Sequence, residues 1–322
     1  VMLNQGSLSN KGIEISLNGE IIHSKDWSWN IGANIGFNKS TIGDLGFEPA
    51  DFGDLKQVRG YLGNSIGDHF GIANIFLVDQ APGLFFGYKT DGIVQEEDIA
   101  DGKGVKYTAP DGSTKYYTKD PSSGSVKPHA GDVKYVDMNG DGVIDENDKT
   151  IIGDPNPDFT YGFQTRVSWK SLSLSASFNG VYGADRLNTN IRYNMTPATN
   201  AGNLTQEAFL NSWTAENHSN LYPGTGYLIP NGVVMDRYVE DASYLRCSDI
   251  TLNYILPKLW TNKIGFENIS VFASLKNAFV ITSYSGYDPE VNSFAFDGLR
   301  PGIDMSPYPS ARSYVFGLNV TF

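Results

Sequence analysis

The chain ends in the nine residues YVFGLNVTF, which run from Tyr314 to Phe322. Successive side chains of a strand point to opposite faces. One face of this segment therefore carries Tyr314, Phe316, Leu318, Val320 and Phe322, and the other carries small, polar or β-branched residues. An apolar face with aromatic residues at both ends is typical of a transmembrane barrel strand. A half-buried strand of a soluble sandwich alternates in the same way, so the rest of the chain must decide.

The same alternation recurs along the chain, at residues 12–20, 27–38, 159–169, 172–182, 249–256 and 269–276. The lengths of these segments are close to about ten residues, which is the length of a transmembrane barrel strand, whereas strands of soluble proteins usually have about five or six residues. Less regular strands are predicted at 72–79 and 84–94, which makes about nine in all. Aromatic residues gather near the strand ends, as two interfacial girdles would require: Trp27, Trp169, Tyr254 and Phe322 at one level, and Phe37, Phe159, Tyr182 and Tyr314 at the other. The predicted fold is an all-β, transmembrane antiparallel β-barrel.

The connections between these strands alternate in length. Those at 24–26, 81–83 and 170–171 are short and 257–267 is moderate, whereas 40–71, 95–158, 183–243 and 283–312 are long. Outer-membrane barrels have short periplasmic turns and long extracellular loops, so the terminal strand is expected to run inward. Single-chain bacterial barrels have an even number of strands. An odd count predicts that residues 1–322 are the C-terminal segment of one barrel domain, with an N-terminal plug and further strands upstream.

Composition excludes several classes of protein. The 322 residues carry a net charge of −12, so no basic surface is expected for nucleic acid. No run of eighteen apolar residues exists, which excludes a transmembrane helix but not a barrel. The single cysteine, Cys247, cannot form an internal disulfide. Charges predicted on the polar strand faces are Glu14, Arg166, Asp249 and Lys276; they could tune passage of a solute or pair with one another across the wall.

One local motif points to a metal. DMNGDGVIDEND (137–148) matches the calcium-loop template, with Gly142 at the sharp turn. The predicted ligands are Asp137, Asn139, Asp141, the Val143 carbonyl, Asp145 and Asp148. Asp148 departs from the template, which has a bidentate glutamate there, and resembles dockerin-type loops. The alternative is a surface turn without an ion. A bound Ca²⁺ is expected to have a structural role, ordering an extracellular loop, with an affinity of order 10⁻⁴ to 10⁻³ M.

Two weaker signals concern other functions. GNSIG (63–67) spells the nucleophile-elbow pattern around Ser65, but no helical periodicity follows it, which argues against catalysis. The long connection 183–243 holds Trp213, Tyr222, Tyr227 and Tyr238, which could stack on sugars or clasp a peptide. The favoured interpretation is that the connection packs on itself around a short helix expected near 205–213.

Six further stretches form a recognisable series: FGYKTDGI (86–93), GDVKYVD (131–137), IGDPNPDFTYGF (152–163), DASYLR (241–246), GYDPEV (286–291) and the ending from Tyr308 to Phe322. They resemble the C-terminal barrel region of SusC/RagA-type TonB-dependent transporters of the Bacteroidetes. They follow the family order and span nearly the whole chain.

The resemblance implies a barrel of about 22 strands, as in large outer-membrane transporters. It implies active import of oligosaccharides or oligopeptides, TonB contact through the plug, and a SusD-like surface lipoprotein as a lid. Lipid and lipopolysaccharide would surround a multi-pass barrel in a Gram-negative, Bacteroidetes-like outer membrane. Residues 95–158, with the calcium-type motif, and 183–243 would then be extracellular loops. An outer-membrane enzyme or adhesin on the same barrel, or a passive porin, are the alternatives.

Overall fold

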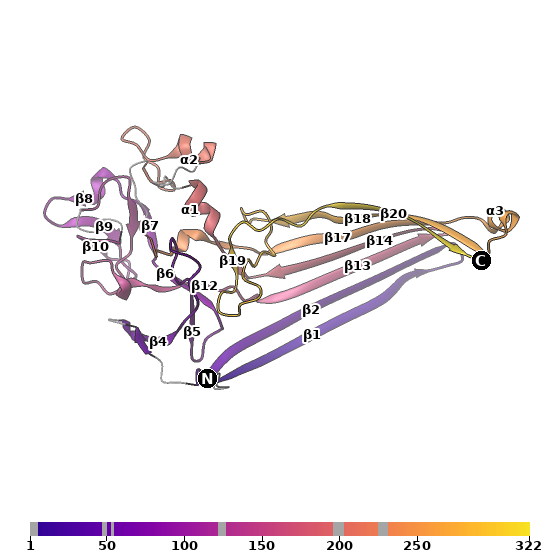
Figure 1. Cartoon of the computed structure of the whole chain (residues 1–322), viewed down its shortest axis with the longest axis horizontal. Helices are drawn as coiled ribbons and strands as arrows, with labels where there is room; N and C mark the ends of the chain where they lie inside the picture. The colour runs from indigo at the N-terminus through magenta and orange to yellow at the C-terminus, as the bar shows by residue number, and fades with distance from the viewer. Residues whose placement is uncertain (1–5, 47–49, 53–54, 122–126, 196–202, 225–230) are drawn as a thin grey trace.

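The computed structural model describes residues 6–46, 50–52, 55–121, 127–195, 203–224 and 231–322. Its dominant element is a long, curved antiparallel sheet of seven strands in the order β1-β2-β13-β14-β17-β18-β20 (Figure 1). The strands are β1 (Ser7–His23), β2 (Trp27–Asp44), β13 (Phe159–Trp169), β14 (Leu172–Tyr182), β17 (Tyr244–Ile255), β18 (Asn268–Thr282) and β20 (Ser313–Thr321). The all-β, mostly antiparallel architecture is as predicted. No helix in the described ranges combines the length and apolarity needed to cross a membrane.

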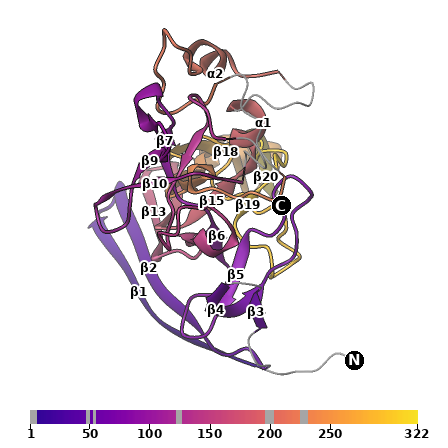
Figure 2. The same cartoon turned by 90° about the vertical axis from the view of Figure 1, so that its left-hand side faces the viewer.

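The remaining strands gather at one end of this sheet, in a region we call the loop layer (Figures 1 and 2). Its largest sheet has the order β12-β6-β5-β4-β3, from β3 (Ala50–Phe52), β4 (Leu55–Leu62), β5 (Asn74–Leu77), β6 (Leu84–Gly87) and β12 (Thr150–Gly153). The smaller sheets contain β7 (Thr90–Ile93), β8 (Ile99–Ala100), β9 (Gly104–Thr108), β10 (Thr114–Tyr117), β11 (Val133–Tyr135), β15 (Asp185–Asn188), β16 (Val239–Asp241) and β19 (Ile303–Asp304).

Short helices complete the molecule. The loop layer contains η1 (Glu96–Asp98), η2 (Glu146–Asp148), α1 (Thr189–Met195), α2 (Gln206–Asn211) and η3 (Asp236–Tyr238). Two more, α3 (Lys258–Thr261) and η4 (Asn262–Ile264), lie in the β17–β18 connection at the opposite end of the sheet, close to the C-terminus (Figure 1).

The prediction of about nine barrel strands was wrong for two of them. Residues 72–79 and 84–94 form β5, β6 and β7 of the loop layer, not strands of the seven-stranded sheet. Side chains there are buried in succession, as in Leu84, Phe85 and Phe86, instead of alternately. A strand buried on both faces is short and continuously apolar, and that pattern was mistaken for an irregular barrel strand. The 81–83 turn therefore also lies in the loop layer, and one connection joins β2 to β13. Seven is still odd, so β1 and β20 run in the same direction.

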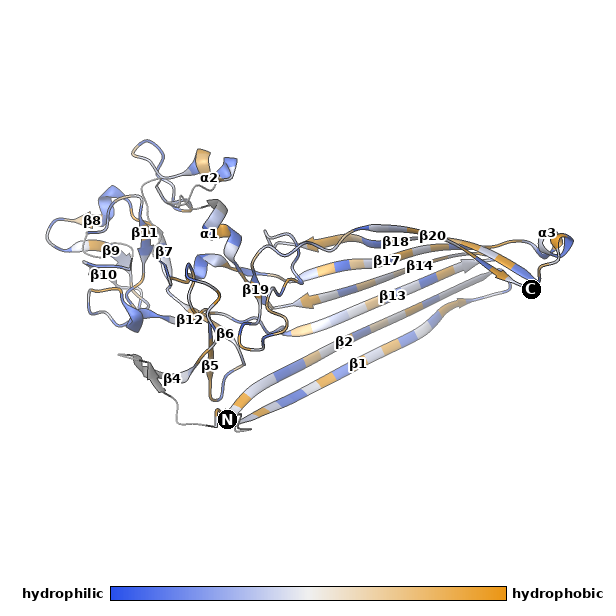
Figure 3. Cartoon of the chain, in the orientation of Figure 1, coloured by the Kyte–Doolittle hydropathy of each residue, from blue (hydrophilic) through white to orange (hydrophobic). Residues whose placement is uncertain are grey.

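The two faces of the seven-stranded sheet differ in polarity. Large side chains on one, the apolar face, are exposed: Leu17 is 70% exposed and Phe316 is 78% exposed. On the polar face, one register row contains Asn18, Gly32, Gln164, Ser177, Asp249 and Lys276. An open groove of about 670 Å³ follows this face and is lined by Asn18, Glu20, Asn30, Gln164, Arg166 and Ser177 among others. Figure 3 shows the alternation of hydropathy along the strands.

Each predicted aromatic girdle is present in three of its four residues. Phe322 lies outside the row of the first girdle, because Leu318, four residues earlier, continues that row through Val271. Trp27 stacks on Trp169 with ring centroids 5.9 Å apart, and Tyr254 lies in the same register row through Leu172. At the other end Phe159 contacts both Phe37 and Tyr182, at 5.6 and 5.0 Å between centroids. Tyr314 was misplaced, because it pairs with Leu275 in a row near the middle of the sheet.

The hydrophobic core of the molecule is in the loop layer. Its largest cluster of buried side chains includes Phe70, Phe85, Tyr88, Ile93, Tyr107, Tyr117, Tyr135, Leu187, Met235, Tyr238 and Ile303. These residues come from every long connection between the sheet strands. Burial of apolar surface therefore joins the connections into one folded layer at the end of the sheet.

Candidate functional site

The calcium-type loop lies between β11 and β12, within the loop layer. Gly140 and Gly142 have φ of +80° and +87°, a conformation that glycine adopts without strain. These two residues let the chain fold back so that polar side chains surround its backbone. The sharp turn that the sequence predicted at Gly142 is present.

Most of the predicted ligands hold the loop together by accepting backbone hydrogen bonds. Asp137 accepts from the amides of Gly140 and Gly142, the latter at 2.7 Å. Asn139 Oδ1 accepts from Asp141 N–H, and Asp141 Oδ1 accepts from Val143 N–H, each at 2.9 Å. At the far end of the loop, Asp145 Oδ1 accepts from Asn147 N–H at 2.8 Å.

Asp148 closes the loop from its last position. Its Oδ1 accepts from the Met138 amide at 2.8 Å, and its Oδ2 accepts from the Asp145 amide at 2.8 Å. The side chain of this final residue thus reaches both the second and the ninth positions of the motif. The Asp148 carboxylate therefore joins the backbone near the start of the loop to the backbone of its last turn.

Two of the acidic side chains are buried. Asp137 is 1% exposed and Asp148 is 0% exposed. Burial is the largest cause that raises the pKa of Asp148 to about 6; the Asp137 carboxylate acts in the same direction, while the amide donors oppose it. Burial and the same loop carboxylates raise the pKa of Tyr107 to about 12, and its hydroxyl donates to the Asp137 carbonyl at 3.2 Å. Buried carboxylates in such a setting favour a cation or a proton.

The donor set fits a hard cation in chemistry, since it consists of carboxylate, amide and carbonyl oxygens. Each carboxylate oxygen that accepts one amide retains capacity for a second partner. Within the described ranges, however, no three Asp, Glu, His or Cys side chains already converge as a metal site. The Ca²⁺ site at Asp137, Asn139, Asp141, Val143, Asp145 and Asp148 stays a prediction.

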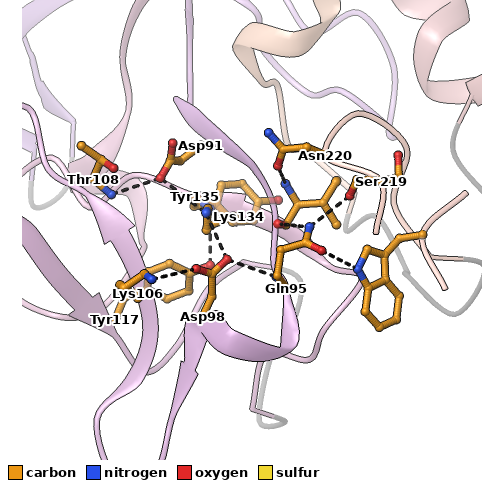
Figure 4. A network of polar contacts seen from close by, with 12 residues as sticks. Asp91, Gln95, Asp98, Lys106, Thr108, Tyr117, Lys134, Tyr135, Ser219 and Asn220 are labelled. Atoms are coloured by element: carbon orange, nitrogen blue, oxygen red, sulfur yellow. Dashed lines mark hydrogen bonds and ion pairs between the residues drawn. The ribbon is translucent and has the colours of Figure 1, made fainter. Parts of the chain in front are cut away.

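A polar network next to this loop joins two of the long connections (Figure 4). Lys134 Nζ lies 3.1 Å from Asp98 Oδ2 and 3.6 Å from Asp91 Oδ2, and the Lys134 side chain is only 12% exposed. Lys106 contacts the other oxygen of Asp98 at 3.5 Å. These ion pairs tie β7, η1, β9 and β11 together. The cluster could not be predicted from the spacing of its residues in the sequence, because they lie on three separate strands and a short helix.

The second half of the network reaches the 183–243 connection. Gln95 donates to the Ser219 carbonyl at 3.0 Å and accepts from the Trp213 indole N–H at 2.9 Å. Asn220 Oδ1 accepts from Ile93 N–H at 3.0 Å. The two connections are therefore fixed to each other through side-chain hydrogen bonds.

These contacts support the packing interpretation for three of the four aromatic residues of 183–243. Trp213 packs against the main core, while Tyr222 and Tyr238 are 6% and 1% exposed. Tyr227 lies outside the described residues. The short helix expected near 205–213 is present as α2, with Thr205 as its N-cap.

The segment around Ser65 does not form a nucleophile elbow. Residues 68–70 form a turn after Ser65, instead of the helix that a nucleophile elbow needs, and Ser65 Oγ accepts a hydrogen bond from Gly67 N–H at 3.2 Å.

Two of the charges predicted on the polar face form an ion pair. Lys276 Nζ lies 2.6 Å from Asp249 Oδ2, so these two side chains pair across neighbouring strands.

No protein-family model matches the chain. Curated relatives include TonB-dependent receptors P26 and P3 of Formosa agariphila, 31% and 29% identical over 99% of this chain and 30% and 29% of their own lengths. The TonB-dependent receptor SusC of Bacteroides thetaiotaomicron is 28% identical over 99% of this chain and 27% of its own length. The chain is related to the SusC-type TonB-dependent receptors. It spans about three-tenths of the length of these relatives.

Solved structures agree in fold. The RagAB peptide importer in its closed-closed state matches with a TM-score of 0.71 at 24% identity, over 99% of this chain and 30% of that one. Its open-open state matches with a TM-score of 0.68 at 23% identity, over 98% and 29%. The predicted resemblance to SusC/RagA proteins is confirmed. These relatives are named as receptors and importers, in agreement with the prediction that the chain is not an enzyme.

Proposed function

We propose that this chain forms part of the wall and the extracellular loop layer of an outer-membrane, SusC/RagA-type importer. The observation that carries the proposal is the seven-stranded sheet with a large exposed apolar face and an opposite polar face. Exposure of such an apolar face to water costs free energy, whereas in a bilayer the face contacts lipid chains. The polar face then borders a water-filled lumen. The sequence relationship to TonB-dependent receptors supports the same assignment.

The finer parts of the proposal follow from that assignment. The chain is the C-terminal segment of one barrel domain, residues 95–158 and 183–243 belong to extracellular loops, and a plug elsewhere in the polypeptide contacts TonB. A SusD-like lipoprotein covers the loop layer. The cargo is an oligosaccharide or an oligopeptide, and the name of the RagAB importer supports a peptide. Lipid and lipopolysaccharide surround the apolar face.

Uptake by cells tests the importer directly. A strain lacking the gene is compared with wild type for growth on defined oligopeptides and oligosaccharides, and for accumulation of the labelled compounds. Loss of uptake of one class, restored by the intact gene and abolished without TonB, is the expected result. Uptake that continues without TonB would instead identify a passive porin, and hydrolysis lost on Ser65→Ala would identify an enzyme.

We further propose that the 137–148 loop binds Ca²⁺ and that the ion orders the loop layer. The buried pair Asp137 and Asp148 favours this function, because an ion would compensate both charges. The test is calcium titration of the full-length protein, with Asp141→Ala as the variant and Asp111→Ala as its control. Asp111 is an exposed acid in a similar turn, accepting from Ser113 N–H at 2.9 Å, outside the motif.

Wild type is expected to bind Ca²⁺ with a Kd of order 10⁻⁴ to 10⁻³ M. Asp141→Ala removes one carboxylate ligand and is expected to weaken binding at least about ten-fold, equivalent to about 1.4 kcal/mol. Asp111→Ala should bind as wild type does. The metal hypothesis fails if Asp141→Ala titrates like wild type, or if no binding is detected at millimolar calcium.

A further inference from the structure

The connection between β17 and β18 exposes three large apolar side chains at the end of the sheet farthest from the loop layer. Leu259 of α3 is 78% exposed, Trp260 is 61% exposed, and Ile264 of η4 is 62% exposed. The other two turns at this end, 24–26 and 170–171, are much shorter. A two-residue turn is enough to join antiparallel strands, so the additional helical residues need another explanation.

This connection continues the apolar face of the sheet. Phe266 packs against Phe322, with ring centroids 5.4 Å apart, and Phe322 follows the alternate positions Phe316, Leu318 and Val320. Figure 1 places α3 just beyond the strand ends, beside the C-terminus, and Figure 3 shows it as a mixture of apolar and polar residues. The aromatic pair Trp27–Trp169 lies at the same end of the sheet.

Lysines accompany these apolar groups. The three connections 24–26, 170–171 and 256–267 contain Lys25, Lys170, Lys258 and Lys263 but only the acids Asp26 and Glu267. This end is therefore locally basic in a chain whose net charge is −12. Lys170 Nζ lies 5.5 Å from the centroid of the Trp169 ring. Tryptophan and lysine together are characteristic of a membrane–water interface, where the lysine chain keeps its charge at the headgroups.

We propose that residues 256–267 form an interfacial anchor. Leu259, Trp260 and Ile264 insert at the boundary between headgroups and acyl chains, and Lys258 and Lys263 bind the phosphates of anionic phospholipids in the inner leaflet. Apolar insertion and lysine attraction act together in such segments. The inference rests on the proposed function, because it takes the apolar face of the sheet to lie in a bilayer.

The experiment uses the full-length polypeptide reconstituted in vesicles, with Cys247→Ala as background and single cysteines carrying a polarity-sensitive fluorophore. Leu259→Cys reports the anchor. Leu318→Cys, on the apolar face of β20, reports the membrane placement itself, and Asp111→Cys in the loop layer is the water-exposed control. Phosphatidylcholine or phosphatidylglycerol with brominated acyl chains serves as the quencher.

The expected result is quenching at 259 and 318 but not at 111. Brominated phosphatidylglycerol should quench position 259 about two- to five-fold more than brominated phosphatidylcholine at equal mole fraction. Replacing Lys258 and Lys263 together by glutamine should remove this preference while leaving position 318 unchanged.

Two failures are distinguishable. Quenching at 318 without quenching at 259 would overturn the anchor alone. Absence of quenching at both positions would overturn the membrane placement, and with it the proposed function. Equal quenching of position 259 by both lipids would refute the recognition of anionic headgroups.

Discussion

An arginine placed on the two faces of β14 should have very different effects on stability. Ala176 and Ser177 are neighbours at the middle of this strand, which runs from Leu172 to Tyr182. Ala176 pairs with Thr165 and Ile250 on the apolar face, whereas Ser177 pairs with Gln164 and Asp249 on the polar face. The substitutions Ala176→Arg and Ser177→Arg therefore introduce the same side chain at the same depth, one into lipid and one into the lumen.

The magnitude follows from the geometry of the strand. Eleven residues at about 3.3 Å each span about 36 Å, or about 25 Å along the membrane normal at a tilt of about 45°. That height equals the apolar band of an outer-membrane barrel, so the middle of β14 lies near the bilayer midplane. Arginine facing lipid there costs about 2–4 kcal/mol. The ratio of folded to unfolded protein should fall by about 30- to 1000-fold for Ala176→Arg.

Ser177→Arg should change stability by no more than about 0.5 kcal/mol, since its side chain enters the open groove opposite the Asp249 carboxylate. The assay measures the denaturant concentration at which half of the full-length protein in vesicles is unfolded. The folded fraction is read from the heat-dependent change in the mobility of the protein on a gel. Equal midpoints for the two variants, or a lower midpoint for Ser177→Arg, would refute the assignment of the faces.

Two further predictions concern the loop layer. Trp213→Phe removes the indole N–H bonded to Gln95 and should destabilise the junction between the long connections by about 1–2 kcal/mol, seen as faster amide exchange in 213–224; unchanged exchange would show that the bond contributes nothing. Burial raises the pKa of Asp185, so the folded state holds the proton on this carboxyl more tightly than the unfolded state does. Stability against proteolysis should therefore fall as the pH rises above the range in which an ordinary carboxyl group titrates. Asp185→Asn should make this dependence of stability on pH weaker. An unchanged dependence would show that it arises from another group.

Strict alternation made the seven long strands predictable. Each has one apolar face and one polar face, so nearly every residue from Phe159 to Trp169 indicates by its polarity the face on which it lies. Segments 72–79 and 84–94 were misassigned because Ile75, Phe85 and Phe86 are buried within the loop layer, where both faces of a strand are apolar. Burial of both faces of a strand depends on packing against segments that are distant in the sequence.

The backbone turn of the candidate metal loop was predictable because its chemistry is local. Gly142 has the positive φ that the template needs at its sharp turn, and the Asp148 carboxylate accepts a backbone hydrogen bond from Met138 in the same segment. The network of Asp98, Lys134 and Gln95 could not be found in this way. Its residues are brought together by the pairing of β7 with β11 and by the contact of the 213–220 segment with Gln95, neither of which can be read from the spacing of residues in the sequence.

Lipid accessibility along β14 tests the central claim most directly. Single cysteines at each position from 172 to 179, labelled and exposed to brominated lipid in the reconstituted full-length protein, should give quenching with a period of two. Leu172, Leu174, Ala176 and Phe178 are predicted to be quenched, and Ser173, Ser175, Ser177 and Asn179 to be protected from lipid and accessible to a water-soluble quencher. Quenching without alternation, or accessibility of both faces to water, would contradict a membrane-spanning wall.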